Sequence, residues 1–173
     1  VIQRDYAQGR ENVEDIRNNF LESIKNALDT KTDLDLNFVY VSANGKLFTP
    51  IDGQQRLTTL YLLHVYLMLA LEKKMDKGSN KRIAKFTYET RTTSRDFCKN
   101  LTSKPLTIRK DKKLSEVKSV SEEITNNNWF SSSWKKDPTI KSMLNMLDSI
   151  HALFKNANLS EYFNLLSGNA GDD

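Results

Sequence analysis

The sequence predicts an α+β fold in which a small β-hairpin leads into a buried helix and a mainly helical part follows. Two β-rich stretches in residues 37–50 flank Asn44-Gly45, a dipeptide that strongly favours a hairpin turn. Residues 61–71, YLLHVYLMLAL, are almost all apolar and dense in leucine, methionine and alanine, which suits a buried helix. The composition later shifts towards lysine, serine and asparagine. We therefore expect a core over residues 1–103 and a helical extension over residues 104–173.

The first half of the chain begins with a helical pattern. Apolar residues recur there every three or four positions with polar residues between them, which predicts an amphipathic helix over residues 12–28. Its expected buried positions are Val13, Ile16, Phe20, Ile24 and Leu28. The hairpin follows over residues 34–51, and the core helix then extends to about residue 74.

The second half carries one strand signal and several helix starts. The segment FTYETR (residues 86–91) is rich in β-branched and aromatic residues and predicts a short strand. Thr93 or Ser94 then suits the N-cap of a helix, and SVSEEI (residues 119–124) suits another capped start. Asp137-Pro138 predicts the clearest late helix, because an N-cap is followed by proline in the first turn. Its expected buried stripe is Ile140, Met143, Leu144, Leu147, Ile150, His151 and Phe154.

The bulk numbers describe a globular chain. It has 173 residues, of which 38% are hydrophobic and 28% charged, enough for a real core. The apolar run from Leu57 to Leu71 is shorter than the roughly 20 residues that span a bilayer, so we expect no membrane association. A single cysteine, Cys98, and the lack of a signal peptide favour the cytoplasm. The chain starts at Val1 without methionine and ends in GNAGDD, which we interpret as a fragment of a longer protein.

The strongest candidate site is DGQQR (Asp52–Arg56), where the hairpin ends and the core helix begins. Helix N-termini expose unpaired N–H groups and favour anions. Gly53 would let the backbone approach a ligand, and the guanidinium of Arg56 matches phosphate oxygens. In the structural alternative, Asp52 caps the helix, Gly53 turns the chain and Gln55 completes a capping box. That alternative leaves Gln54 and Arg56 unexplained, so local physics keeps both interpretations open.

Other polar residues add weaker signals. The segment Ile2–Arg10, IQRDYAQGR, is rich in long polar side chains, and Arg4 would meet Arg56 on one anion if this segment lay beside the junction. His64 and His151 fit core positions, Cys98 fits a small buried hydrophobe, and no zinc spacing, P-loop or Rossmann motif occurs. Three aromatic residues are expected to be packing anchors: Trp129, Phe130 and Trp134.

A basic stretch lies between residues 104 and 118. The chain as a whole carries a net charge of only +4, which does not by itself argue for a nucleic-acid partner. The local excess has two explanations, a solvated loop or a contact with a DNA backbone. The candidate DNA-contacting residues are Arg109, Lys110, Lys112 and Lys113.

Several of these segments together resemble the N-terminal domain of GmrSD-type restriction endonucleases, a bacterial family with a ParB/sulfiredoxin-like fold. The resemblance rests on QRDY (residues 3–6), on the hairpin and above all on IDGQQRLTTL (residues 51–60). Two later segments also match, FTYETRTTSRDF (residues 86–97) and WFSSSWKKDPTIKSML (residues 129–144). Two positions depart from the family pattern: Val1-Ile2 replaces a proline and an aromatic residue, and Ala7-Gln8 stands where many members carry a tryptophan.

The resemblance implies NTP binding and hydrolysis, coupled to cleavage of modified foreign DNA. It leaves GTP, ATP and CTP undecided as the nucleotide. Asp52, Gln54 and Gln55 would then be catalytic, with Asp52 holding Mg²⁺ or positioning the attacking water. The implied phosphate-binding residues are Gly53, Arg56, Thr58, Gln3 and Arg4.

The resemblance also implies partners. An HNH-type nuclease domain or subunit would cut the DNA, since this chain lacks the clustered histidine and asparagine of such a nuclease. DNA would be contacted through the full-length protein, and an oligomer is compatible with this picture. The competing hypothesis is a non-catalytic module that binds DNA or docks a partner. A direct nuclease is disfavoured, because the sequence shows no cluster of metal-binding carboxylates.

Overall fold

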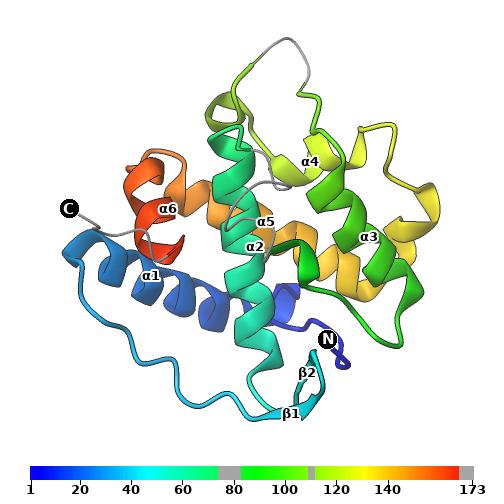
Figure 1. Ribbon diagram of the computed structural model, residues 1–173. Coiled ribbons are helices and arrows are strands. Elements are labelled where there is room, and N and C mark those ends of the chain that lie inside the picture. Colours follow the sequence, from blue (N-terminus) through cyan, green and yellow to red (C-terminus); the bar gives the residue numbers. More distant parts are fainter. Residues whose placement is uncertain (74–82, 109–111, 168–173) are drawn as a thin grey trace.

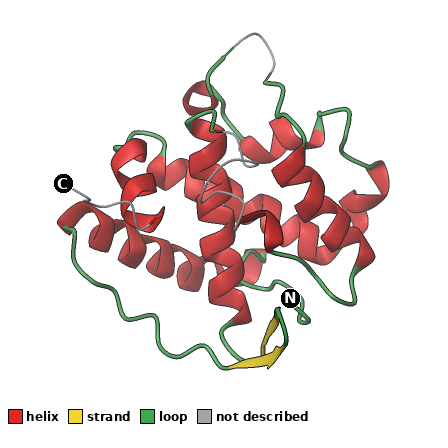
Figure 2. Cartoon of the chain, viewed as in Figure 1, coloured by secondary structure: helices red, strands yellow, loops and turns green. Residues whose placement is uncertain are grey.

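The structure, a computed structural model, describes residues 1–73, 83–108 and 112–167, and this part of the chain is mostly helical (Figure 1 and Figure 2). The predicted α+β class is confirmed, because one antiparallel hairpin accompanies the helices. None of the helices in these ranges is both long and apolar enough to cross a bilayer. The elements are η1 (Glu11–Val13), α1 (Glu14–Thr30), β1 (Val41–Asn44), β2 (Leu47–Pro50), α2 (Gln54–Ala70), α3 (Thr92–Ser103), η4 (Leu114–Glu116), α4 (Val120–Thr125), η5 (Ser132–Lys136), α5 (Pro138–Phe154) and α6 (Leu159–Ser167).

Helix α2 runs through the centre of the molecule, as Figure 1 shows. It packs against α5 and α6, and α5 in turn packs against α1 and α4. A helix that is apolar on every side belongs in a core, and the predicted buried helix is confirmed, although it ends at Ala70. Residues from both sides of the expected boundary near residue 103 share one hydrophobic core, and that boundary stays a prediction. Six hydrophobic α2 residues are completely buried: Leu62, Leu63, Val65, Tyr66, Leu67 and Met68.

The capping signals of α4 and α5 are confirmed. The Asp137 carboxylate accepts hydrogen bonds from the backbone N–H groups of Thr139 (2.8 Å) and Ile140 (3.2 Å), and Pro138 occupies the first turn of α5. The Ser119 hydroxyl likewise accepts a bond from the backbone of α4 at 3.0 Å. All seven predicted stripe positions of α5 are buried, so sequence pattern and capping agree along this helix.

Helix α1 is amphipathic, but its buried face differs from the prediction. Ile24 and Leu28 are buried as expected, whereas Ile16 is 61% exposed. Arg17 and Leu21 take the inward positions instead. Arg17 tolerates burial because its guanidinium donates to a backbone carbonyl oxygen seven residues earlier, at 2.9 Å, while its aliphatic stem packs. The predicted and the observed buried positions both fit the helical period. The sequence pattern favoured the predicted positions because Arg17 is polar and was not expected to be buried.

The predicted strand over residues 86–91 does not form. Only Tyr88 pairs, in an isolated parallel bridge with Ile2. The Ile2 backbone donates to Thr87 O at 2.8 Å and accepts from Glu89 N at 3.0 Å. The pairing stops there because the backbone N–H groups of residues 3 and 4 bond to a side chain of α2 instead.

The predicted cap of α3 by Thr93 or Ser94 is also wrong. The helix begins at Thr92, and its N-cap, Arg91, makes no side-chain capping bond in the described structure. Both hydroxyls point to the start of another helix, where Thr93 and Ser94 donate to the carboxylate of Asp137. Asp137 therefore caps α5 and at the same time joins it to α3.

The predicted packing roles of His151, Cys98 and the three aromatic residues are confirmed. His151 is buried, and its two ring nitrogens lie 3.1 Å from the Tyr66 hydroxyl and 3.0 Å from Val117 O. Cys98 is buried, and this burial raises the pKa of its thiol to about 12, so it stays a neutral small hydrophobe. Four aromatic rings pack together between α3 and η5: Phe97, Trp129, Phe130 and Trp134.

The N-terminal segment (Ile2–Arg10) lies against the helical body, close to the hairpin (Figure 1). It passes α5 so closely that a Cβ atom on Gly9 would lie 1.7 Å from Ser142 O. Asn145 of α5 also donates to the Gly9 carbonyl oxygen at 3.2 Å. Only glycine fits this contact, and the segment is thereby fixed beside the start of α2.

Candidate functional site

The junction between β2 and α2 is built around Gly53. This residue is the N-cap of α2 and has a left-handed backbone, with φ of 79°. The left-handed backbone favours glycine, and a Cβ atom here would also crowd the side chains of Val39 (Cγ2 at 3.0 Å) and Arg56 (Nη2 at 3.1 Å). No side chain caps α2 in the described structure, and the proposed Asp52–Gln55 capping box does not form. The first N–H groups of a 17-residue helix are thus left for another partner.

Gln54 joins the N-terminal segment to this junction. It is 4% exposed, and its Oε1 atom accepts from the backbone N–H groups of Gln3 (3.0 Å) and Arg4 (2.9 Å). Its Nε2 atom donates to Pro50 O at 2.7 Å. The amide therefore connects α2, β2 and the N-terminal segment through backbone atoms alone.

The Gln55 side-chain amide bonds to the next part of the N-terminal segment, again through backbone atoms. Its Oε1 atom accepts from Ala7 N at 2.7 Å and Gln8 N at 3.3 Å. Its Nε2 atom donates to Asp5 O at 2.6 Å. Together the two glutamines hold the backbone of residues 3–8 across the first turn of α2.

The segment is fixed from its other side by charges and hydroxyls. Asp5 forms ion pairs with Arg91 and, at 3.9 Å, with Arg10. The Tyr6 hydroxyl lies 2.6 Å from Thr59 Oγ1, and burial raises the pKa of Tyr6 far above its ordinary value, so this hydroxyl stays neutral. These contacts hold the N-terminal segment in place beside the first turn of α2, where it forms one wall of the site.

A pocket of about 200 Å³ opens between this wall and the helix N-terminus. Arg4 reaches it from the N-terminal segment and Arg56 from the first turn of α2, so the predicted convergence of the two arginines on one site is supported by the geometry. Gln8 also lines it and was not among the predicted site residues, although its place in a polar segment marked it as unusual. The lining residues are Arg4, Gln8, Ile51, Asp52, Gly53, Gln54, Gln55 and Arg56.

Arg56 is held in place but not neutralised. Its Nη2 atom donates to Phe38 O at 2.8 Å. Its nearest described carboxylate is that of Asp52, at 3.8 Å, and the Asp52 side chain is 64% exposed, so this ion pair is weak. The Nε atom of Arg56 is buried and has no hydrogen-bond partner among the described residues. The Nε atoms of Arg17 and Arg91 are buried and unpaired in the same way, so this feature does not by itself mark a ligand site.

Two of the predicted phosphate-binding side chains lie elsewhere. Thr58 is buried, and its hydroxyl donates to Gln54 O at 2.9 Å, within α2. The Gln3 side chain donates to Glu89 at 2.7 Å, and only its backbone takes part in the junction. Neither residue lines the pocket, so their predicted roles find no geometric support, whereas Asp52, Gly53, Arg56 and Arg4 come together.

A divalent cation would have one carboxylate ligand here. Asp52 is the only carboxylate among the described residues that line the pocket, and the described part of the chain holds no cluster of three metal-ligating side chains. Mg²⁺ in nucleotide sites is held by one or two carboxylates together with the substrate's own phosphates and water. The donor set therefore fits a magnesium ion that arrives with a nucleotide rather than a resident metal.

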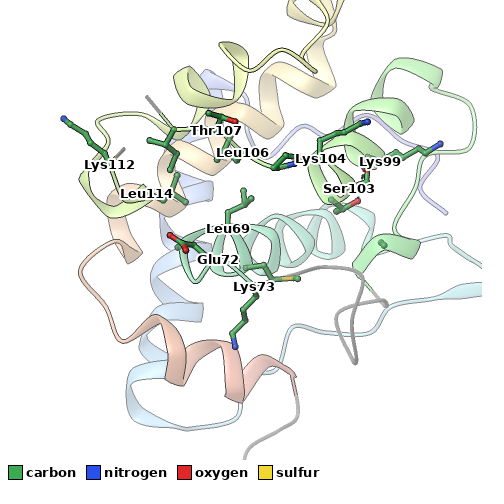
Figure 3. Close-up of a pocket in the computed structure, with 16 residues that line it drawn as sticks. Leu69, Glu72, Lys73, Lys99, Ser103, Lys104, Leu106, Thr107, Lys112 and Leu114 are labelled. Carbon is green, nitrogen blue, oxygen red and sulfur yellow. Dashed lines mark hydrogen bonds between the residues drawn. The ribbon is translucent and has the colours of Figure 1, made fainter. Parts of the chain in front are cut away.

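A larger cavity of about 1000 Å³ lies at the other end of α2 (Figure 3). Leu69 lies near its middle, and the amines of Lys73 and Lys112 extend outward from it in Figure 3. Lys112 and Lys113, two predicted DNA-contacting residues, are exposed, and Lys112 lines this cavity together with Lys99 and Lys104. The other two, Arg109 and Lys110, lie outside the described residues. Its described lining carries more lysines than carboxylates: Lys73, Lys99, Lys104 and Lys112 against Glu72.

Comparison with known proteins gave one match. A family model described as GmrSD restriction endonuclease, N-terminal domain, matches residues 1–170. Searches of curated proteins and of solved structures gave no match. The match covers nearly the whole chain, including both the N-terminal segment and the DGQQR turn.

Proposed function

The chain belongs to the family of GmrSD restriction endonuclease N-terminal domains, and on that premise we propose that it binds and hydrolyses a nucleoside triphosphate at the Asp52–Arg56 pocket. Membership makes the chain part of a restriction endonuclease system. The proposed domain regulates cleavage of modified DNA by a nuclease domain or subunit. One observation carries the proposal: two arginines from separate segments line one pocket at an uncapped helix N-terminus.

The phosphates would be bound mainly by backbone and guanidinium groups. The uncapped first N–H groups of α2 would donate to the phosphate oxygens, and Gly53 lines the same pocket. Arg56 and Arg4, which both line the pocket, would neutralise the charge. GTP, ATP and CTP present the same phosphates, so this part of the site does not choose between them.

The two glutamines receive a different role from the one first predicted. A glutamine that orients phosphate oxygens or water needs a free amide, and the amides of Gln54 and Gln55 are already bonded to backbone atoms. We therefore assign them to positioning: they hold Arg4 beside Arg56. Their predicted direct part in catalysis stays untested.

Asp52 is the remaining candidate for the chemical step. Its carboxylate is exposed at the pocket, where it can accept a hydrogen bond from a water molecule or ligate Mg²⁺ that bridges the phosphates. A bound magnesium ion would withdraw charge from the transferring phosphoryl group. Stabilising charge and orienting the water are the main demands of phosphoryl transfer.

Nucleotide-dependent thermal stability tests the binding site. A ligand at 100 times its Kd stabilises the folded state by about 2.7 kcal/mol, so GTP, ATP or CTP with Mg²⁺ should raise the Tm by several degrees. Arg56→Ala should cut this shift to half or less, because it removes a charge-assisted bond to phosphate worth about 1.5–3 kcal/mol. Arg95→Ala is the matched control, since Arg95 is an exposed arginine of α3 that does not line the pocket.

Two results would separate binding from turnover. Asp52→Asn should keep the nucleotide-induced Tm shift and lose phosphate release, if the carboxylate serves the chemical step. An Arg56→Ala protein that retains the full shift would refute the phosphate site. Equal losses in the Arg95→Ala control would show that the effect is not local to the pocket.

A second candidate function is DNA binding or partner docking at the basic surface. The clustering of Lys99, Lys104 and Lys112 around the larger cavity favours it, because phosphate backbones are bound by such lysines. Salt-sensitive DNA binding that Lys112→Ala and Lys113→Ala weaken, and that Arg56→Ala leaves unchanged, would support this function. If both lysine variants bound DNA as tightly as the wild type, this surface would be excluded as the DNA-binding site.

A further inference from the structure

The exposed large hydrophobic side chains of the described structure are concentrated in one segment. Phe38 is 79% exposed and Tyr40 is 62% exposed, and the only exposed large hydrophobic outside this segment in the described part is Ile16. Several exposed apolar side chains in one region often mark a binding site. We call this surface the hairpin patch; it consists of Leu34, Phe38, Val39, Tyr40, Val41, Leu47, Phe48 and Ile51.

The hairpin patch adjoins the phosphate pocket. The carbonyl oxygen of Phe38 accepts the bond from Arg56, and the Val39 side chain lies against Gly53. The carbonyl oxygen of Tyr40 accepts from the backbone of Ile51, which itself lines the pocket. Figure 1 shows the chain crossing outside the helical body between α1 and β1, and the patch begins on this crossing.

The size of the pocket explains why a ligand would extend onto this surface. Sites that enclose a whole drug-sized ligand measure roughly 300–1,000 Å³, whereas this pocket measures about 200 Å³. It has room for phosphates but not for a complete nucleotide. The sugar and base of a bound nucleotide must therefore lie outside it, on whatever surface borders it.

We propose that Phe38 and Tyr40 form a platform on which the base of the bound nucleotide stacks, an inference that rests on the proposed function. The two rings are neighbours, with centroids 6.4 Å apart and planes inclined at 48°, and both side chains are largely exposed. Stacking uses the π-face that every base presents, and it needs no polar partner. This matches the patch, which offers apolar surface beside the guanidinium of Arg56.

The test compares a nucleotide with its phosphates alone. Binding of GTP and of inorganic tripolyphosphate, both with Mg²⁺, is measured by titration calorimetry for the wild type and for Phe38→Ala/Tyr40→Ala. The double variant should bind GTP about tenfold more weakly, because stacking contributes of that order per base. Its affinity for tripolyphosphate should change less than twofold.

Two further variants serve as controls for the position and the aromatic character of the platform. Phe48→Ala removes an equally exposed aromatic ring of the hairpin patch on β2 and should change neither affinity. Phe38→Trp keeps an aromatic face and should retain GTP binding. Thermal unfolding of each variant checks that the fold is intact.

Each contrary outcome has a definite meaning. Equal GTP binding by the double variant and the wild type, or an equal loss for GTP and tripolyphosphate, would overturn the platform while leaving the phosphate site in place. The same GTP loss in Phe48→Ala would also overturn it, in favour of a general apolar docking surface. If the wild type bound neither probe, the proposed function itself would fail.

Discussion

Replacing Gln54 with alanine removes the three hydrogen bonds that join α2 to β2 and to the N-terminal segment. The lost donor leaves Pro50 O buried without its partner, which costs about 1–3 kcal/mol. The N–H groups of Gln3 and Arg4 are only partly buried, so water replaces their acceptor at about 0.5–1 kcal/mol each. We expect the free energy of unfolding to fall by roughly 2–5 kcal/mol in total.

Urea denaturation followed by circular dichroism measures this change. The midpoint should fall while the slope with urea concentration stays constant, because the surface exposed on unfolding hardly changes. Gln3→Ala is the matched control: it deletes the same side chain at an exposed position, where a single bond to Glu89 is lost. Its effect should stay within about 0.5 kcal/mol.

The comparison of the two glutamines can refute the reasoning. If Gln54→Ala lowered the free energy of unfolding by less than about 1 kcal/mol, or no more than Gln3→Ala, then Gln54 would not hold the segment. Amide hydrogen exchange adds a local measure, since residues 3 and 4 should lose protection in Gln54→Ala before the helices do.

Two further predictions concern the turn and a half-buried histidine. Gly53→Ala should lower the free energy of unfolding by about 1–2 kcal/mol because of the left-handed backbone, and by more because the added Cβ crowds Val39. Gly45→Ala is the control for backbone strain alone, since Gly45 has φ of 59° and open space around it. Equal Tm losses in the two variants would exclude crowding at Gly53. Burial lowers the pKa of His64 below its ordinary value, so the unfolded chain takes up the proton first and stability should fall as the pH drops through about 6.5. His64→Gln should flatten the Tm profile between pH 7.5 and 5.5, and an unchanged profile would remove His64 as its source.

The helices were predictable where local chemistry sufficed. Asp137 and Ser119 cap α5 and α4 as their sequence neighbourhoods suggest, since a cap acts within its own first turn. The apolar run of α2 likewise predicts burial without any knowledge of its neighbours. Where an outcome depends on a distant partner, the pattern misleads. The strand expected around Tyr88 is reduced to one bridge, because its partner, the N-terminal segment, bonds to α2 instead.

The candidate site was located from the sequence, but its internal roles were not. The glycine, the arginine and the helix start are all visible as a local motif, and the structure brings them to one pocket. The partners of Gln54 and Gln55 are backbone groups of a segment about fifty residues away. Backbone groups are the same at every residue, so no side-chain pattern could show that these amides were already engaged. Thr58 was misplaced for a related reason: its helical position directs it to the core.

The attachment of residues 3–8 through their main chain has a consequence for variation and redesign. Because Gln54 and Gln55 recognise N–H and C=O groups, they impose no requirement on which side chains the segment carries. Arg4 can thus be exchanged while the segment keeps its place, whereas Gln8 is also held through its side chain, which accepts a hydrogen bond from Thr59 at 2.6 Å. Changes at position 4 can therefore alter which anion the pocket prefers while the main-chain contacts that hold the segment stay in place.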